Sequence, residues 1–182
     1  MFLYINKEMG AQMKNFVFVF TVFYFLFLSG CSLFEPKDEF DIIEALPPTA
    51  SGGEITVISQ VARSEDDAEQ NARGGVYLAS SDLELTTDAG NQQIIGMRFR
   101  LDIPQGAKIT EATIQFTADE VTTGTASLQI FAEASDNAEA YASITNNISI
   151  RPTTSASVSW SPAEWSTINI AAEAQLTPSL VS

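Results

Sequence analysis

The stretch Ile95-Gly-Met-Arg-Phe-Arg-Leu-Asp-Ile103 decides the fold class, because apolar and polar residues alternate along it. Successive side chains of a β-strand point to opposite faces of the sheet, so this pattern predicts a strand with one apolar and one polar face. Pro104-Gln-Gly106 comes next and predicts a turn. The sequence therefore indicates a half-buried strand that ends at this turn.

The same alternation recurs along much of the chain, in residues 55–61, 109–118, 126–132 and 157–160. Threonine and β-branched residues are frequent there, and turn signals such as Thr122-Thr-Gly124 separate the segments. No long segment with the helical period of 3.6 follows residue 53. We therefore predict an all-β fold over residues 54–182, an antiparallel β-sandwich of the jelly-roll type.

The residues before this domain have a different character. Lys14 precedes a largely apolar run of 13 residues, 16–28. A helix needs about 20 apolar residues to span a bilayer, so the shorter run is typical of the apolar core of an export signal peptide. We expect residues 1–30 to form a signal-peptide helix. Residues 31–53, with their charged, Pro-rich and Gly-rich stretches, are expected to form a flexible tether.

Leu28-Ser-Gly-Cys31 closes the signal peptide and resembles the lipobox of bacterial lipoproteins. The resemblance implies that the chain is cut after Gly30 and that Cys31 receives lipid, whose acyl chains, such as palmitate, hold the mature protein on a membrane. The residue after Cys31 is Ser32, whereas an aspartate at this position resembles a signal for retention in the inner membrane. The absence of that aspartate favours the outer membrane or the cell surface. The alternative is an uncleaved signal anchor with a free Cys31.

Charge and composition exclude several classes of function. Residues 31–182 contain seven basic and 22 acidic residues, a balance that repels the phosphates of nucleic acids. The chain has no histidine and one cysteine, which excludes Ser-His-Asp and Cys-His catalysis and an internal disulfide. We therefore expect no enzyme. The less favoured interpretation is a polysaccharide lyase or hydrolase that works through carboxylates, Tyr, Lys or Ser.

A series of motifs runs through the predicted domain, in residues 64–69, 76–85, 96–99, 103–110, 112–120, 135–138 and 160–165. In this order they resemble a bacterial extracellular β-sandwich module akin to the DNRLRE-type and alginate-binding carbohydrate-binding modules. The resemblance covers about residues 54–181 and implies a noncatalytic binding or structural module at the cell surface. Further strands follow residues 177–180 in such modules, so we expect the domain in residues 54–182 to be incomplete at its C-terminus.

Two groups of side chains are candidate sites. Structural calcium is the one cofactor considered, held by carboxylates of Asp66, Asp67, Glu69 and Asp82, but a solvated acidic loop is the favoured explanation of these residues. Contact with a glycan is considered for Tyr77, Arg98, Arg100, Trp160 and Trp165. The favoured alternatives are packing of the aromatic rings in the core and cross-strand pairing of the arginines with acids.

Together these features predict a lipid-anchored extracytoplasmic module for binding or adhesion. Its partners would be the membrane, through the N-terminal lipid, and a polysaccharide or surface proteins, but no nucleic acid. The alternative is a noncatalytic spacer that forms the N-terminal part of a larger surface protein or enzyme.

Overall fold

The computed structural model describes residues 2–8, 11–23, 54–85, 87–104 and 106–181. Across these ranges the regular structure consists of β-strands and one short 3-10 helix, η1 (Glu173–Gln175). The all-β prediction is confirmed. No helix within the described ranges is both long enough and apolar enough to cross a membrane.

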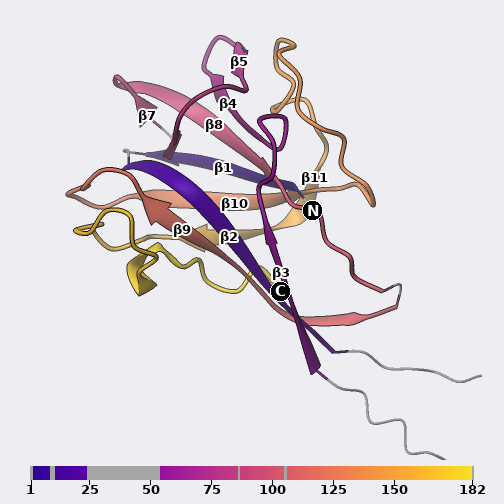
Figure 1. Ribbon diagram of the computed structural model, residues 1–182. Helices are drawn as coiled ribbons and strands as arrows, with labels where there is room; N and C mark the ends of the chain where they lie inside the picture. Colours follow the sequence, from indigo (N-terminus) through magenta and orange to yellow (C-terminus); the bar gives the residue numbers. More distant parts are fainter. Residues whose placement is uncertain (1, 9–10, 24–53, 86, 105, 182) are drawn as a thin grey trace, which may run out of the picture.

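The first sheet places β1 between β10 and β8 (Figure 1). Its strands, in spatial order, are β11 (Thr153–Trp160), β10 (Ser127–Glu133), β1 (Phe2–Glu8), β8 (Asn91–Arg98), β4 (Asp67–Asn71) and β5 (Val76–Tyr77), and β7 (Thr87–Asp88) pairs with the start of β8. Every neighbouring pair in this sheet is antiparallel. β1 is thus an interior strand with a partner along both edges.

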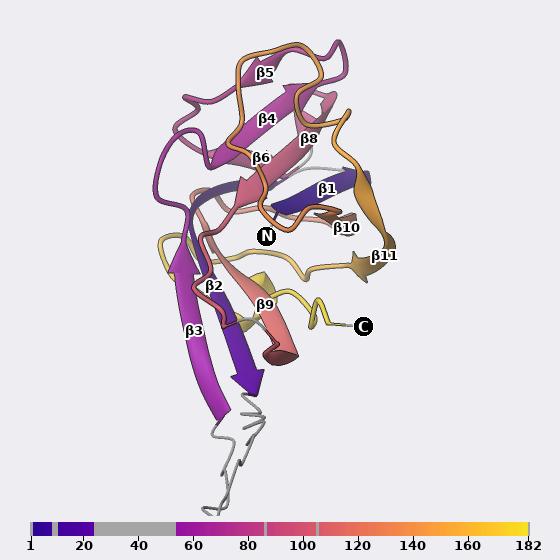
Figure 2. The same cartoon turned by 90° about the vertical axis from the view of Figure 1, so that its right-hand side faces the viewer.

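The second sheet is built around its longest strand, β2 (Ala11–Phe23). β9 (Lys108–Ala118) pairs along one edge of β2, while β3 (Glu54–Gln60) and β6 (Leu83–Leu85) pair in succession along the other. All three pairings are antiparallel. Figure 2 shows β3, β2 and β9 running together. β2, like β1, has partners on both sides.

Side chains from the facing surfaces of the two sheets form one apolar core. Ile95 and Met97 of β8 have no exposed surface, and neither do Ile114 and Phe116 of β9. The other buried members of this core are Leu83, Leu85, Phe99, Ala112, Ala118, Leu128, Ile130, Trp160 and Trp165. The alternation of residues 95–99 and 112–118 therefore predicted the core-facing side of these segments correctly.

Aromatic rings close one region of this core. The Trp160 ring stacks on Phe116 with ring centroids 5.4 Å apart, and the Trp165 ring lies 6.3 Å from both. The indole Nε1–H of Trp165 donates a hydrogen bond to the carbonyl oxygen of Ala174 at 3.0 Å, so its polar atom is satisfied inside the protein.

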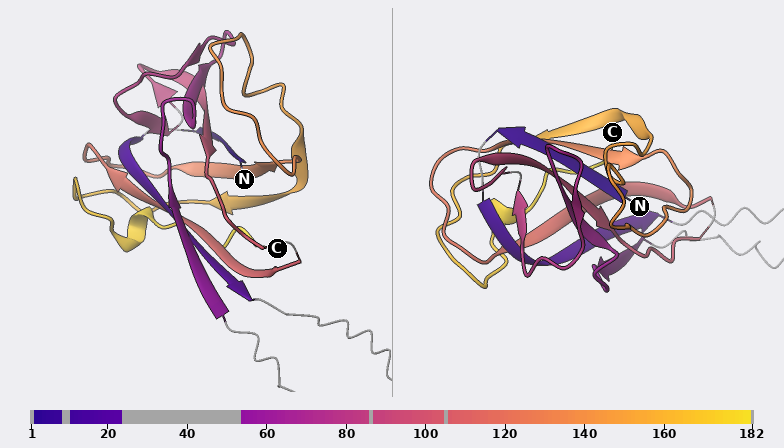
Figure 3. Two further views of the ribbon diagram at one scale, coloured as in Figure 1. Left: turned by 45° about the vertical axis from the view of Figure 1, so that its right-hand side comes forward. Right: turned by 90° about the horizontal axis from the view of Figure 1, so that it is seen from above.

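The C-terminal segment covers the outer edge of β9 (Figure 3). The backbone N–H of Thr177 donates to the carbonyl of Ile114 at 3.0 Å, and the N–H of Leu180 donates to the carbonyl of Ala112 at 2.7 Å. The Thr177 hydroxyl in turn accepts the N–H of Ile114 at 2.9 Å. These bonds satisfy backbone groups that would otherwise form an open sheet edge.

A smaller cluster lies on the outer face of the first sheet. The buried Tyr141 ring packs directly against the backbone of Gly96 in β8, so closely that a Cβ atom at Gly96 would overlap the ring. The cluster also contains Ala68, Val76, Ala138 and Ile148. It fixes the long connection between β10 and β11 onto the sheet.

Arg151 ties this connection together from within. Its guanidinium donates hydrogen bonds to the carbonyl oxygens of Asn147 and Ala140, both at 2.8 Å, and lies 3.2 Å from a carboxylate oxygen of Glu133. The central carbon of this guanidinium, Cζ, lies 4.6 Å from the centre of the Tyr141 ring, which adds a cation–π contact. The connection is therefore ordered without regular secondary structure.

The N-terminal residues differ from expectation. A signal-peptide helix is predicted for residues 1–30, but the structure has strands β1 and β2 over residues 2–8 and 11–23. The physical reason is composition, because the Phe, Val and Thr residues of β2 favour an extended backbone as readily as a helix. The predicted cleavage site at Gly30, the lipid site at Cys31 and the rest of the tether lie outside the described residues.

We predict that Gly96→Ala destabilises the fold by about 1–3 kcal/mol, because the new methyl group displaces the Tyr141 ring. Urea unfolding followed by tryptophan fluorescence measures the change. The same substitution in a Tyr141→Leu background is the control and should cost less, since the overlapping ring is gone. An equal cost in both backgrounds would contradict the proposed overlap.

Candidate binding cleft

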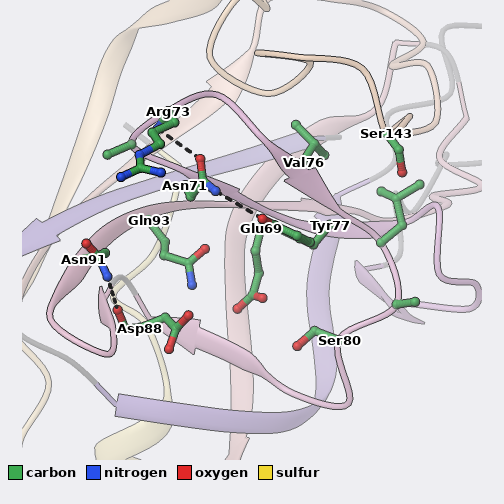
Figure 4. Close-up of a pocket in the computed structure, with 13 residues that line it drawn as sticks. Glu69, Asn71, Arg73, Val76, Tyr77, Ser80, Asp88, Asn91, Gln93 and Ser143 are labelled. Carbon is green, nitrogen blue, oxygen red and sulfur yellow. Dashed lines mark hydrogen bonds between the residues drawn. The ribbon is translucent and has the colours of Figure 1, made fainter.

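A cleft of about 740 Å³ opens beside the β4–β5 hairpin. Its walls come from β4, β5, the segment that follows β5, and the β7–β8 hairpin, and Ser143 lies at one side (Figure 4). Carboxylate, amide, hydroxyl and guanidinium groups line it, together with one large aromatic ring. The cleft joins an exposed aromatic ring to several polar groups, which makes it a candidate binding site.

Asn71 shapes the turn that forms one wall. Its side-chain oxygen accepts the backbone N–H groups of Arg73 and Gly75 at 2.9 and 3.0 Å, so one amide group closes the whole turn. Its side-chain nitrogen donates to the hydroxyl of Tyr77 at 3.2 Å. The amide therefore both builds the turn and positions the ring that follows it.

The turn is also held against the connection between β10 and β11. Gly74 has a φ of +87°, and its carbonyl oxygen accepts the backbone N–H of Asn146 at 2.8 Å. A side chain at Gly74 would collide with the Asn146 side chain, so only glycine allows this approach. Two segments far apart in sequence are locked together at the cleft wall.

Tyr77 provides an open aromatic face. Its side chain is 56% exposed, although its hydroxyl is held by Asn71. Tyr77 pairs with Glu69 across β4 and β5, so the two side chains lie on the same face of the sheet. The ring thus stands beside a carboxylate.

Glu69 is a carboxylate buried between the two sheets, with only 5% of its surface exposed. Its Oε1 atom accepts the backbone N–H of Glu84 in β6 at 2.7 Å, which links the first sheet to the second. Burial raises the pKa of Glu69 to about 7, helped by the negative charges of Glu84 and Asp82 and opposed by hydrogen bonds from Glu84 and Ser80. Near neutral pH this group is present in both protonation states.

Gln93 lines the floor of the cleft. It is 5% exposed, and its side-chain oxygen has no hydrogen-bond partner within the described structure. It lies opposite Asn71 across β8 and β4, and Figure 4 shows its amide pointing into the same space as Glu69. A buried acceptor without a partner is destabilising by about 1–3 kcal/mol, so a donor from a bound molecule would be favourable at this position.

The residues predicted to contact a glycan do not form one site. Tyr77 lines the cleft, but Trp160 and Trp165 are 5% and 2% exposed and pack in the core. For these two the expectation of ligand contact is corrected to a packing role, because their rings offer no face to a molecule from outside. Short aromatic motifs do not distinguish these two roles in sequence.

The two arginines lie at a second concave region, of about 860 Å³. The Arg98 side chain is paired with the carboxylate of Asp66 and also donates to the carbonyl of Ala138 at 3.1 Å. The Arg100 side chain is 89% exposed, with its Nε 3.6 Å from a carboxylate oxygen of Asp102. Cross-strand pairing with an acid therefore describes Arg98, whereas Arg100 contacts an acid of its own segment. Neither arginine lines the cleft that holds Tyr77.

The predicted calcium ligands are also divided. Asp66 pairs with Arg98, and Asp82 accepts a hydrogen bond from the Ser81 hydroxyl at 2.9 Å. Asp67 and Glu69 share one face of β4, and burial raises the pKa of Asp67 to about 6. Within the described ranges, no group of three or more Asp, Glu or Cys side chains is arranged to hold a metal ion. Calcium binding stays a prediction without a preformed site in these ranges.

Sequence reasoning missed Asn71, Gln93, Asp88 and Asn91, all of which line the cleft. The only local signal was the turn sequence Asn71-Ala-Arg-Gly-Gly75, which indicates a hairpin and nothing about a ligand. Comparison with protein-family models, curated proteins and solved structures finds no match for the chain. Function is therefore inferred from the residues themselves.

We predict that Glu69→Gln flattens the pH dependence of stability. Glu69 has a pKa of about 7 when folded and an ordinary value of 4.5, so the folded state holds a proton that the unfolded state releases between these values. The contribution of this proton to the free energy of unfolding is fully present below pH 4.5, falls as the pH rises, and is lost above about 7. The wild-type protein should lose on the order of 2–3 kcal/mol more than the variant between these limits.

Urea unfolding at a series of pH values measures this difference. The exposed Glu65→Gln provides the control, because it removes the same charge without changing a buried group. Parallel curves for wild-type protein and Glu69→Gln would contradict the assignment of the raised pKa to Glu69.

Proposed function

We propose that this chain is a lipid-anchored, noncatalytic module that binds polysaccharide on the outer side of a bacterial membrane. The observation that carries the proposal is the cleft, where an exposed tyrosine ring stands beside a buried amide oxygen that lacks a hydrogen-bond partner. The runner-up is a noncatalytic spacer in a larger surface protein, which would bind no glycan.

The chemistry of the cleft suits a sugar ring. A pyranose presents C–H groups on its faces, which pack on an aromatic ring, and hydroxyl groups around its edge. The Tyr77 ring offers the flat surface, while Gln93 and Glu69 offer hydrogen-bonding atoms at its side. A hydroxyl donated to the Gln93 oxygen would remove the cost of that buried acceptor.

Charge in the cleft favours a neutral sugar over a strongly anionic one. Asp88 contributes one carboxylate and Glu69, which is partly protonated near neutral pH, a second, against one guanidinium from Arg73. Arg98 and Arg100, whose guanidinium groups would suit the carboxylate of an acidic sugar, belong to the other concave region. We therefore place neutral polysaccharide first among the ligands of this cleft.

The fold assignment in this proposal is a jelly-roll-like β-sandwich. Support comes from two antiparallel sheets that enclose a shared apolar core. The absence of histidine from the sequence supports a noncatalytic role. A rigid scaffold of this kind would present the cleft to a ligand, as scaffolds commonly present binding residues.

Membrane attachment through Cys31 rests on the sequence. The apolar run of residues 16–28 is followed at once by Leu28-Ser-Gly-Cys31, and this is the one cysteine of the chain. Two or three acyl chains on Cys31 give stable anchoring where a single chain does not. The strongly acidic remainder of the chain suits a soluble exported domain.

We expect Tyr77→Ala to weaken binding to the best glycan found on an array by about tenfold, because the stacking surface is lost. Isothermal titration with that glycan measures the affinity. Tyr77→Phe keeps the ring and should retain binding, and Arg100→Ala in the other concave region should leave it unchanged. An array with no bound glycan would favour the spacer, and an effect of Arg100→Ala alone would place the site elsewhere.

We expect the exported protein to begin at Cys31 and to carry lipid. Intact mass spectrometry of the protein extracted from membranes tests this, together with labelling by a palmitate analogue. Cys31→Ser should abolish the label, while Ser32→Ala, a matched neighbouring change, should keep it. Unlabelled wild-type protein that retains residues 1–30 would indicate the uncleaved anchor instead.

A further inference from the structure

The strands β1 and β2 occupy interior positions in the two sheets, yet they consist of residues that export would remove. β1 lies between β8 and β10, and β2 lies between β9 on one side and β3 and β6 on the other. Cleavage after Gly30, which is part of the proposed function, takes away both strands. The mature domain would then have a gap one strand wide in each sheet.

These gaps would be unfavourable if left empty. Each exposes two strand edges whose backbone N–H and C=O groups have lost their partners. Removing the strands would also admit water to Ile95, Met97 and Ile130, which are at most 2% exposed when β1 is present. Removal of β2 would likewise admit water to Ile114 and Phe116 of the neighbouring strand β9, which have no exposed surface when β2 is present.

We propose that the mature domain is a strand acceptor, and that both positions are filled by a pair of extended polypeptide segments from outside residues 31–182. Only a polypeptide can satisfy the open edges along their length, because each edge presents alternating donors and acceptors at the spacing of a β-ladder. The donor runs antiparallel to both neighbours in each gap, as β1 and β2 do.

The register of β1 and β2 defines what the donor must look like. In the first gap, every second position lies on the core side of the sheet, beside Ile95 and Ile130, and the positions between lie on its outer face. In the second gap, alternate positions lie opposite Ile114 and Phe116. A fitting donor therefore has apolar residues at every second position over about seven and 13 residues, the lengths of β1 and β2.

Residues 31–182 offer no such donor. The segment 176–180 is already bonded along the outer edge of β9. Residues 31–53 contain Glu35-Pro-Lys-Asp-Glu39 and Pro47-Pro-Thr-Ala-Ser-Gly-Gly53, which interrupt any alternating apolar run. The segments that fill the gaps must therefore come from polypeptide outside residues 31–182.

The experiment uses the full chain with a specific protease site in place of residues 24–29, made by cell-free synthesis without membranes. After cutting, the N-terminal fragment should stay bound and should exchange with a labelled synthetic peptide of residues 1–23, followed by fluorescence anisotropy. A peptide with Phe18→Pro and Phe20→Pro loses ladder hydrogen bonds and should bind about tenfold more weakly. A peptide with Phe18→Leu and Phe20→Leu, the matched control, should bind like the unchanged one.

The same peptide is then added to mature protein taken from membranes, whose mass establishes that it begins at Cys31. We expect saturable one-to-one binding, or displacement of a polypeptide already bound, and a higher melting temperature. A mature protein whose mass ends at residue 182, and which neither binds the peptide nor holds another chain, would overturn the strand-acceptor proposal while leaving the proposed cleavage and glycan binding intact. A dimer in which residues 31–182 of one copy fill the gaps of the other would overturn it too. A mass that includes residues 1–30 would refute the proposed cleavage and overturn the strand-acceptor proposal with it.

Discussion

Backbone pairing on both edges of β1 and β2 is the constraint on which the architecture depends. Without β1, strands β10 and β11 lose their connection to β8, β4 and β5. Without β2, nothing joins β9 to β3 and β6. Each sheet is thus two halves joined by one interior strand. Because those halves bury the core only when they are held together, hydrogen bonds at the centre of each sheet govern the burial of apolar surface around them.

The cleft depends on the same arrangement. Glu69 reaches the backbone of Glu84 only because the first sheet packs against β6 of the second. That bond holds a carboxylate at the junction of the sheets, where burial raises its pKa. The Tyr77 ring and the Gln93 amide lie on the same face of the first sheet as Glu69. The cleft is therefore a product of how two sheets meet, rather than of one loop.

The sequence predicted the parts of the fold that local alternation encodes. Residues 112–118 and 95–99 turn their apolar side chains inward as expected, because period two has a single geometric solution in a half-buried strand. The expectation fails at Ile55, which is 44% exposed although it alternates in the same way, since β3 lies at a sheet edge. Residues 16–23 show the other limit, because an unbroken apolar run fits a helix and a buried strand equally.

The candidate site was harder to predict, since the aromatic chemistry that singles out Tyr77 applies equally to Trp160 and Trp165, which are buried in the core. Gln93 joins the cleft only through the register of β8 and β4, which no local pattern marks.

The contact between Gly74 and Asn146 has a consequence for how the cleft would meet a ligand. It joins the β4–β5 turn to a connection that Arg151 and Tyr141 already hold on the sheet. A wall fixed in this way loses little conformational entropy when a molecule arrives, so most of the ordering has been completed during folding. The shape and stiffness of the ligand would then decide the affinity. A stiff oligosaccharide that matches the wall would bind with little further loss of conformational entropy, whereas a flexible one would lose conformational entropy of its own on binding.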